Sequence, residues 1–279
     1  MFKATVKNSR GESLQLFPGV DYAVTIDGLT PGRASLNFST VGTNDGSLFN
    51  SARKENRNIV LYIKPLRKIE ENRIKLYRFF ALKRAVKFYF KNGSRDVYID
   101  GIVENVDGSL FEQSQTIQVS IICPSPNFKA LEESADDVSQ IVPLFGFPFS
   151  IPAEGVAFSR IDKIAEKNVF NAGDAESGLI IEMRALGEVS DPVIYDEAGN
   201  SYGVKIALQE GDVITINTNS GEKGITLLRD GKETNIINLV NPNPTWFKLQ
   251  PGDNVFLHSA VNADLLQIVF KHRSQFEGV

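Results

Sequence analysis

The sequence predicts a mainly β protein of two domains, and three observations support this fold class. Most of the chain consists of short runs rich in β-branched and aromatic residues, separated by glycine, asparagine and proline. Only one segment, residues 66–82, has helical periodicity instead. The length of 279 residues is enough for two domains with well-filled cores.

Strands in the first half follow the period-two pattern of a sheet with one wet face. In residues 34–41, for example, Leu36 and Phe38 alternate with Asn37 and Ser39. Further segments with strand composition are residues 22–29 and 58–65, a long hairpin over 85–102, and residues 115–126, which end at prolines.

Residues 66–82 contain no glycine or proline and predict one amphipathic helix. Ile69, Leu76, Tyr77 and Phe80 fall at helical spacing. The two aromatic side chains are expected to press this helix onto the sheet.

A change in composition near the middle of the chain predicts a domain boundary. Residues 130–140 are acidic and polar, and the apolar stretch that follows them is broken by prolines. We therefore expect an N-terminal β-domain over 1–128, a linker over 129–150 and a C-terminal domain over 151–279.

The second half again consists of short strands at nearly regular intervals, which indicates an antiparallel sandwich or a jelly roll. The predicted strands are 178–186, 192–200, 202–208, 212–218, 223–233 and 254–261.

Composition excludes several classes of protein. The net charge of -4 argues against general nucleic-acid binding, which needs a basic surface. No apolar run reaches the ~20 residues of a membrane span, and the N-terminus shows no secretory signal. Cys123 is the single cysteine, which excludes an internal disulfide and fits synthesis in a reducing cytoplasm.

Motifs of catalysis or cofactor binding are not found, so we expect no enzyme activity, no cofactor and no metal. The two histidines, His258 and His272, have no ligand-like neighbours in the sequence. The Gly-Asp pairs within 171–174, 209–212 and 250–254 are interpreted as β-turns. A pair of glycosidase carboxylates among the 34 acidic residues stays an open alternative.

Basic residues dominate between positions 64 and 91, where Glu70 and Glu71 are the only matching glutamates. This density is typical of the solvated face of a helix, or of a patch that docks an acidic partner. The basic residues are Lys64, Arg67, Lys68, Arg73, Lys75, Arg78, Lys83, Arg84, Lys87 and Lys91.

The order of these pieces resembles the distal tail protein family (Dit) of long-tailed, siphovirus-type bacteriophages and prophages. In the first half, the matching residues are Asn56-Arg57-x-Ile59-x-Leu61, then Arg73, Leu76, Tyr77 and Phe80 of the helix, the aromatic hairpin, and Cys123-Pro124-x-Pro126. In the second half, they are the Asn-x-Gly-Asp stretch at 171–174, Pro192-Val193-Ile194, Gly211-Asp212-x-Ile214-x-Ile216-x-Thr218, and Trp246-Phe247-x-Leu249-x-x-Gly252-x-Asn254.

The resemblance implies a non-enzymatic hub of the phage tail tip. Its N-terminal domain would form a hexameric ring and its C-terminal domain a galectin-like β-sandwich. The ring would join the tail tube and the tape-measure end to the tail-tip protein and the receptor-binding protein. Such a protein is located in the virion and is assembled in the cytoplasm of the bacterial host.

Residues 1–128 are expected to carry self-association, because a ring needs two different complementary surfaces on each subunit. The hairpin 85–102 is the predicted projecting element. The candidate interface residues are Arg73, Tyr77, Phe88, Phe90 and Trp246.

Trp246 is the only tryptophan, and it precedes Phe247 on a segment flanked by turns. Neighbouring strand residues point to opposite faces, so Phe247 and Leu249 form the inward column and Trp246 shares a face with Lys248. Trp246 is therefore expected at a sandwich edge or an interface.

Two alternative functions remain open. A carbohydrate-binding adsorption module is one, although the sugar-binding motifs of galectins do not occur here. The other is an adaptor in a contractile-tail-like machine.

Overall fold

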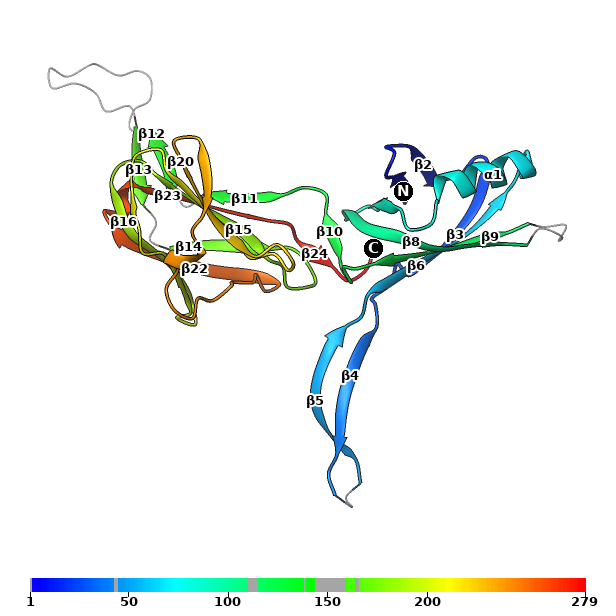
Figure 1. Ribbon diagram of the computed structural model, residues 1–279, viewed down its shortest axis with the longest axis horizontal. Coiled ribbons are helices and arrows are strands. Elements are labelled where there is room, and N and C mark those ends of the chain that lie inside the picture. Colours follow the sequence, from blue (N-terminus) through cyan, green and yellow to red (C-terminus); the bar gives the residue numbers. More distant parts are fainter. Residues whose placement is uncertain (1, 43–44, 110–114, 138, 144–158, 164–165) are drawn as a thin grey trace. The chain divides into compact units, whose positions relative to one another are not determined.

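The computed structural model describes residues 2–42, 45–109, 115–137, 139–143, 159–163 and 166–279 (Figure 1). The chain divides into two compact units. Unit 1 consists of Met1–Glu132 together with Gln275–Val279, and unit 2 consists of Glu133–Ser274.

Unit 1 is built on an antiparallel sheet whose main path runs β2-β1-β7-β8-β9-β6-β3 among the described residues (Figure 1). Its strands are β1 (Lys3–Asn8), β2 (Ser13–Phe17), β3 (Tyr22–Asp27), β6 (Arg57–Pro65), β7 (Ala85–Lys91), β8 (Asp96–Gly108) and β9 (Ile117–Cys123). Two short strands join beside it: β10 (Phe128–Ala130) pairs with β8 and with β24 (Gln275–Phe276).

The core of unit 1 follows from the alternation of side chains along these strands. Ile59, Leu61 and Ile63 of β6 are fully buried, while the residues between them are at least partly exposed. The cluster continues through the buried residues of β7, β8 and β9. Alternating apolar positions therefore build one buried face, as period-two patterning requires.

The predicted helix exists but is shorter than residues 66–82. Helix α1 spans Ile69–Phe79, because Lys68 takes a left-handed conformation with φ 41° just before it. Leu76 is buried within the helix, and Phe80 is buried at its C-terminal cap. Ile69, in contrast, is 41% exposed. The apolar stripe covers only the C-terminal half of α1.

The hairpin 85–102 does not project from the unit, so this expectation was wrong. Strand β7 pairs with β1 on its outer side, and β8 pairs with β9. Both strands therefore lie inside the sheet, and the hairpin 85–102 offers no free sheet edge. The alternation of apolar and polar residues predicts which face of a strand is buried. It does not predict which other strands pair with it.

A different hairpin leaves the sheet. Strands β4 (Ala34–Thr40) and β5 (Ser47–Lys54) pair only with each other among the described residues, and form a separate two-stranded sheet. In Figure 1 this blue hairpin runs clear of the main sheet of unit 1. We call residues 34–54 the arm.

Unit 2 contains two antiparallel sheets around a second core. One sheet has the order β11-β23-β15-β19-β20-β21, and the other β14-β22-β16-β17 with β18 beside β16. The strands are β11 (Ser134–Asp137), β14 (Glu166–Asn171), β15 (Leu179–Ala185), β16 (Val189–Asp196), β17 (Ser201–Gly203), β18 (Ala207–Leu208), β19 (Val213–Asn217), β20 (Gly224–Arg229), β21 (Lys232–Asn235), β22 (Gly252–Val261) and β23 (Leu266–His272).

Side chains from both sheets of unit 2 meet in one cluster, as in a β-sandwich. Ile181 of β15 and Ile194 of β16 are both fully buried in it. A separate pair, β12 (Ser139–Pro143) and β13 (Ser159–Lys163), and two short 3-10 helices (Ile237–Leu239 and Ala263–Leu265) complete the described elements. The mainly β, antiparallel fold class predicted from the sequence is confirmed.

The division of the chain differs from the predicted boundaries at two places. Residues 129–137, assigned to a linker, contain the last two residues of β10 in unit 1 and all of β11 in unit 2. Residues 275–279, assigned to the C-terminal domain, belong to unit 1. Residues 144–150 of the predicted linker lie outside the described residues.

Among the described residues, none of the helices has both the length and the apolar character needed to cross a bilayer.

Candidate interaction surfaces

The arm presents apolar side chains that nothing in the described chain covers. Phe38 and Phe49 lie opposite each other across the two strands, with ring centroids 5.8 Å apart in an edge-to-face arrangement. They are 51% and 55% exposed, and every residue of β5 is exposed. The remaining exposed apolar side chains of the arm are Leu36, Val41 and Leu48. Exposed apolar surface of this kind indicates an interaction site.

Arg57 fixes the base of the arm, although only 4% of this residue is exposed. Its guanidinium donates to the carbonyl oxygens of Gly28 and Thr30, each at 2.6 Å, just before β4 begins. It also donates to the carbonyls of Pro126 at 2.8 Å and of Glu277 at 2.6 Å. Its burial lowers its pKa, and its charge is spread over these four oxygens and the ring of Phe128 at 4.4 Å.

The last residues of the chain complete this anchor. Glu277 forms an ion pair with Lys54, the final residue of β5, at 2.5 Å. Arg95 donates to the carbonyl of Gly278 at 2.5 Å, and the backbone N–H of Val279 donates to the carbonyl of Leu29. The C-terminal segment thus holds the start and the end of the arm together.

Phe88 and Phe90 were expected at an interface, and the structure places them in the core instead. Both are fully buried, and their rings stack at 5.7 Å. They contribute to the stability of unit 1 and have no surface to offer a partner. The aromatic pair that is exposed, Phe38 and Phe49, was not singled out from the sequence. The signal that was available is that Phe38 lies on a predicted strand, residues 34–41.

Arg73 and Tyr77 lie on α1, and the structure brings them together. Arg73 forms an ion pair with Glu70 and lies 5.4 Å from the centroid of the Tyr77 ring. Only 15% of the Arg73 side chain is exposed, and Tyr77 is half-buried against the core of unit 1. Their polar groups are thus largely engaged within the helix.

Trp246 packs against the core of its own unit. Its ring makes an edge-to-face contact with buried Tyr202 at 5.3 Å, and Lys223 lies 5.6 Å from its centroid. As predicted, Phe247 and Leu249 are buried and Lys248 is exposed. Trp246 therefore covers an edge of the unit 2 core and does not present a bare platform on which a sugar could stack.

The single cysteine and the two histidines are at least partly buried. Cys123 is buried, and its burial raises its pKa to about 12, so its thiol stays protonated. Burial lowers the pKa of both His258 and His272. Within the described ranges, there is no group of three or more acidic, histidine or cysteine side chains that could hold a metal.

The Gly-Asp turn at 209–212 shows the structural role that its sequence predicts. Gly211 has φ 89°, and the carboxylate of Asp212 accepts a hydrogen bond from the backbone of Gln209 at 2.8 Å. Arg229 pairs with the same carboxylate at 2.5 Å, and its hydrogen bonds hold the pKa of Asp212 below its usual range. The interpretation of this Gly-Asp pair as a turn is confirmed.

Comparisons with known proteins concern first the C-terminal part of the chain. Residues 172–273 match the family model of the siphovirus-type tail component, C-terminal domain. No curated protein sequence matches the chain.

Solved structures extend the likeness to the whole chain. The Dit protein of phage SPP1, described as a paradigm of hub adsorption apparatus in phages that infect Gram-positive bacteria, is 13% identical. The match covers 98% of this chain and 99% of that one, with a TM-score of 0.69. A chain of the phage P2 baseplate in its activated conformation with Ca is 11% identical over 100% of both chains, with a TM-score of 0.52.

Residues 172–273 therefore resemble the C-terminal domain of siphovirus-type tail components, and the whole chain has the fold of a Dit protein. The resemblance to the distal tail protein family is confirmed. In its C-terminal part and in its fold, the chain thus resembles structural components of phage tails.

Proposed function

We propose that this protein forms a closed ring, hexameric as the family resemblance implies, at the end of the phage tail tube. In this role it joins the tube and the tape-measure end to the tail-tip protein and the receptor-binding protein. It is assembled in the cytoplasm of the bacterial host and is carried in the virion. The likeness to a hub protein and to a baseplate chain supports this role.

The arm is the observation that carries the proposal. About half of the surface of Phe38 and of Phe49 is exposed. Exposed aromatic side chains on a projecting hairpin are typical of a surface that a partner covers. Covering these side chains removes apolar area from water at about 25 cal/mol per Å². We expect a neighbouring subunit to cover these side chains, because the arm extends away from the sheet of its own unit.

In a closed ring, each subunit uses two different surfaces, and we assign the arm to one of them. The interface in a closed ring is heterologous, so the arm of one subunit lies on a different surface of the next. An obligate interface of this kind buries on the order of 2,000 Å² or more. The buried Arg57 anchor fixes the direction of the arm before assembly, which lowers the entropy cost of association.

The experiment compares the solution mass of the full-length protein with that of the double variant Phe38→Ser/Phe49→Ser. The matched control is Phe170→Ser, because Phe170 is 58% exposed but lies in unit 2. The wild type and the control are expected to form the same closed oligomer, and the arm variant is expected to be monomeric with an unchanged circular dichroism spectrum.

A wild type that stays monomeric at every concentration contradicts the ring. An arm variant that assembles like the control contradicts the role of the arm.

A further inference from the structure

Unit 1 contains a hollow with a volume of about 450 Å³ between the β1–β2 turn, β3 and α1. Its floor is apolar, formed by Leu14, Tyr22, Leu76 and Phe79. Lys75 and Arg78 of α1 stand at its rim. The volume falls within the range of pockets that bury most of a small ligand's surface.

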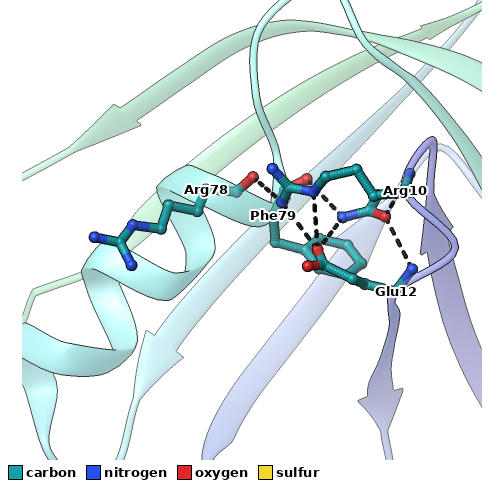
Figure 2. Close-up of polar contacts among 5 residues, drawn as sticks. Arg10, Glu12, Arg78 and Phe79 are labelled. Carbon is teal, nitrogen blue, oxygen red and sulfur yellow. Dashed lines mark hydrogen bonds and ion pairs between the residues drawn. The ribbon is translucent and has the colours of Figure 1, made fainter.

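One wall of this hollow is fixed by a cluster of polar contacts that joins the β1–β2 turn to the end of α1 (Figure 2). Asn8 accepts from the backbone N–H groups of Arg10 and Glu12, and its amide donates to the Glu12 carboxylate at 2.6 Å. Arg10 pairs with that carboxylate at 2.9 Å and donates to the backbone carbonyl of Arg78 at 2.6 Å. These hydrogen bonds and this ion pair hold the β1–β2 turn against the end of α1, and so fix one wall of the hollow.

Among the described residues that line the hollow, Glu12 is the only one with a carboxylate, and this group already accepts hydrogen bonds from Asn8 and Arg10. The hydrogen bond from Asn8, followed by that from Arg10, lowers the pKa of Glu12. Its charge is therefore present at neutral pH and is matched by Arg10 alone.

The two glutamates of α1 pair with cations other than Lys75 and Arg78. Glu70 pairs with Arg73, and Glu71 lies 3.3 Å from Lys68. Among the described residues, no carboxylate lies within ion-pair distance of Lys75, and in Figure 2 the guanidinium of Arg78 points away from Arg10 and Glu12. The charge left at the rim is positive.

The helix dipole explains only part of this arrangement. A cation in the last turn of a helix is favourable by itself, which accounts for Arg78. It does not account for Lys75, which lies one turn earlier, or for the apolar floor beneath both. A cationic rim over an apolar floor matches a ligand that carries carboxylates beside an apolar side chain.

We propose that this hollow binds an acidic segment of a partner protein, which inserts one apolar side chain between β2 and α1. The carboxylates of the segment pair with Lys75 and Arg78, and the fork of the arginine suits two carboxylate oxygens. The floor excludes a plain inorganic anion as the matching ligand, because an anion leaves the apolar surface of Leu14 and Phe79 uncovered. This site is separate from the arm, so it holds whether or not the ring forms.

The test measures binding of short fluorescein-labelled peptides to the full-length protein by fluorescence anisotropy. The first peptide alternates leucine and glutamate, the second has lysine in place of glutamate, and the third has serine in place of leucine. The first is expected to bind best, and its affinity is expected to fall as salt is raised, because the rim charges are exposed.

Two variants locate the binding. Lys75→Glu/Arg78→Glu is expected to weaken binding of the leucine–glutamate peptide by about tenfold or more, because reversed rim charges repel the peptide. The matched control, Lys64→Glu/Arg67→Glu, makes the same change of charge at residues that do not line the hollow and keeps wild-type affinity. Leu14→Asn, which places a polar group in the floor, is expected to weaken binding without changing its dependence on salt.

Equal binding of the serine–glutamate peptide would overturn the proposal, since the site would then recognise charge alone. Equal weakening in the control variant would overturn it as well, because binding would follow net charge and not this hollow. The thermal unfolding midpoint of each variant separates a lost site from a lost fold, and Lys75→Gln/Arg78→Gln gives an intermediate loss if the charges act directly.

Discussion

At the residue scale, Arg57 shows how one buried cation organises distant backbone. The carbonyls that it binds come from the segment before β4, from the turn after β9 and from the C-terminal segment. None of these segments is adjacent to Arg57 in the chain. The buried charge is tolerated because its guanidinium donates four hydrogen bonds to backbone carbonyls.

Replacing this residue is therefore expected to be costly. Arg57→Met keeps the length of the side chain but leaves the four carbonyls without their donor, so the free energy of unfolding of unit 1 is expected to fall by about 3 kcal/mol or more. Urea unfolding followed by circular dichroism measures the loss. The comparison variant Lys54→Met removes an ion pair at the edge of the anchor whose side chains are both more than a third exposed, and it is expected to cost less than about 1 kcal/mol. Equal losses in the two variants would contradict the anchor.

His272 gives unit 2 a dependence on pH. It is 3% exposed on β23, and burial lowers its pKa despite the nearby carboxylates of Asp136 and Glu133, which raise it. The unfolded chain therefore takes up a proton before the folded chain does as the pH falls. Stability is fully present above the ordinary histidine pKa of 6.5 and is lost as the pH drops below it.

Urea unfolding at about pH 7.5 and about pH 5.5 tests this direction. The free energy of unfolding is expected to be lower at the acidic pH, and His272→Leu is expected to flatten the difference. Part of the slope is expected to remain, since burial also lowers the pKa of His258. An unchanged or greater stability at the lower pH would show that His272 is not held neutral.

At the element scale, the sequence predicts strands better than it predicts their partners. Strands β3, β6 and β9 fall within or close to the predicted segments because alternation of apolar side chains is a local signal. Sheet order is not local. The hairpin of β7 and β8 has the composition of a projecting element and lies inside the sheet, because β1 and β9 complete its two sides.

The arm shows the reverse case. Leu36 and Phe38 have the pattern of a strand with one buried face, yet both are more than half exposed. The pattern was correct for a strand, but the surface that would cover it is absent from the described chain. A sequence pattern indicates that one face of a strand is apolar. It does not tell whether the same chain or another subunit covers that face.

The end of α1 and the C-terminal segment show a third limit. The basic run from position 64 to 91 left two readings open, a solvated helix face or a docking patch. The structure shows which of these cations have acidic partners: Lys68 and Arg73 pair with Glu71 and Glu70, and Lys87 and Lys91 pair with Asp100 and Asp96. Likewise, the return of residues 275–279 to unit 1 depends on Arg57 and Arg95, which lie far away in sequence.

At the scale of the whole molecule, the chain carries two cores and passes between its units twice. Because residues 275–279 belong to unit 1, this unit is complete only in the full-length protein. A fragment of residues 1–128 would lack the C-terminal segment that closes the arm anchor, so its failure to assemble would say little. The full-length protein is the right sample.

Images of the purified full-length protein in negative stain test the central claim most directly. The account predicts closed rings with a central hole, in which the arm of each subunit lies on its neighbour. Fields of separate single-chain particles at every protein concentration, with no rings, would contradict it.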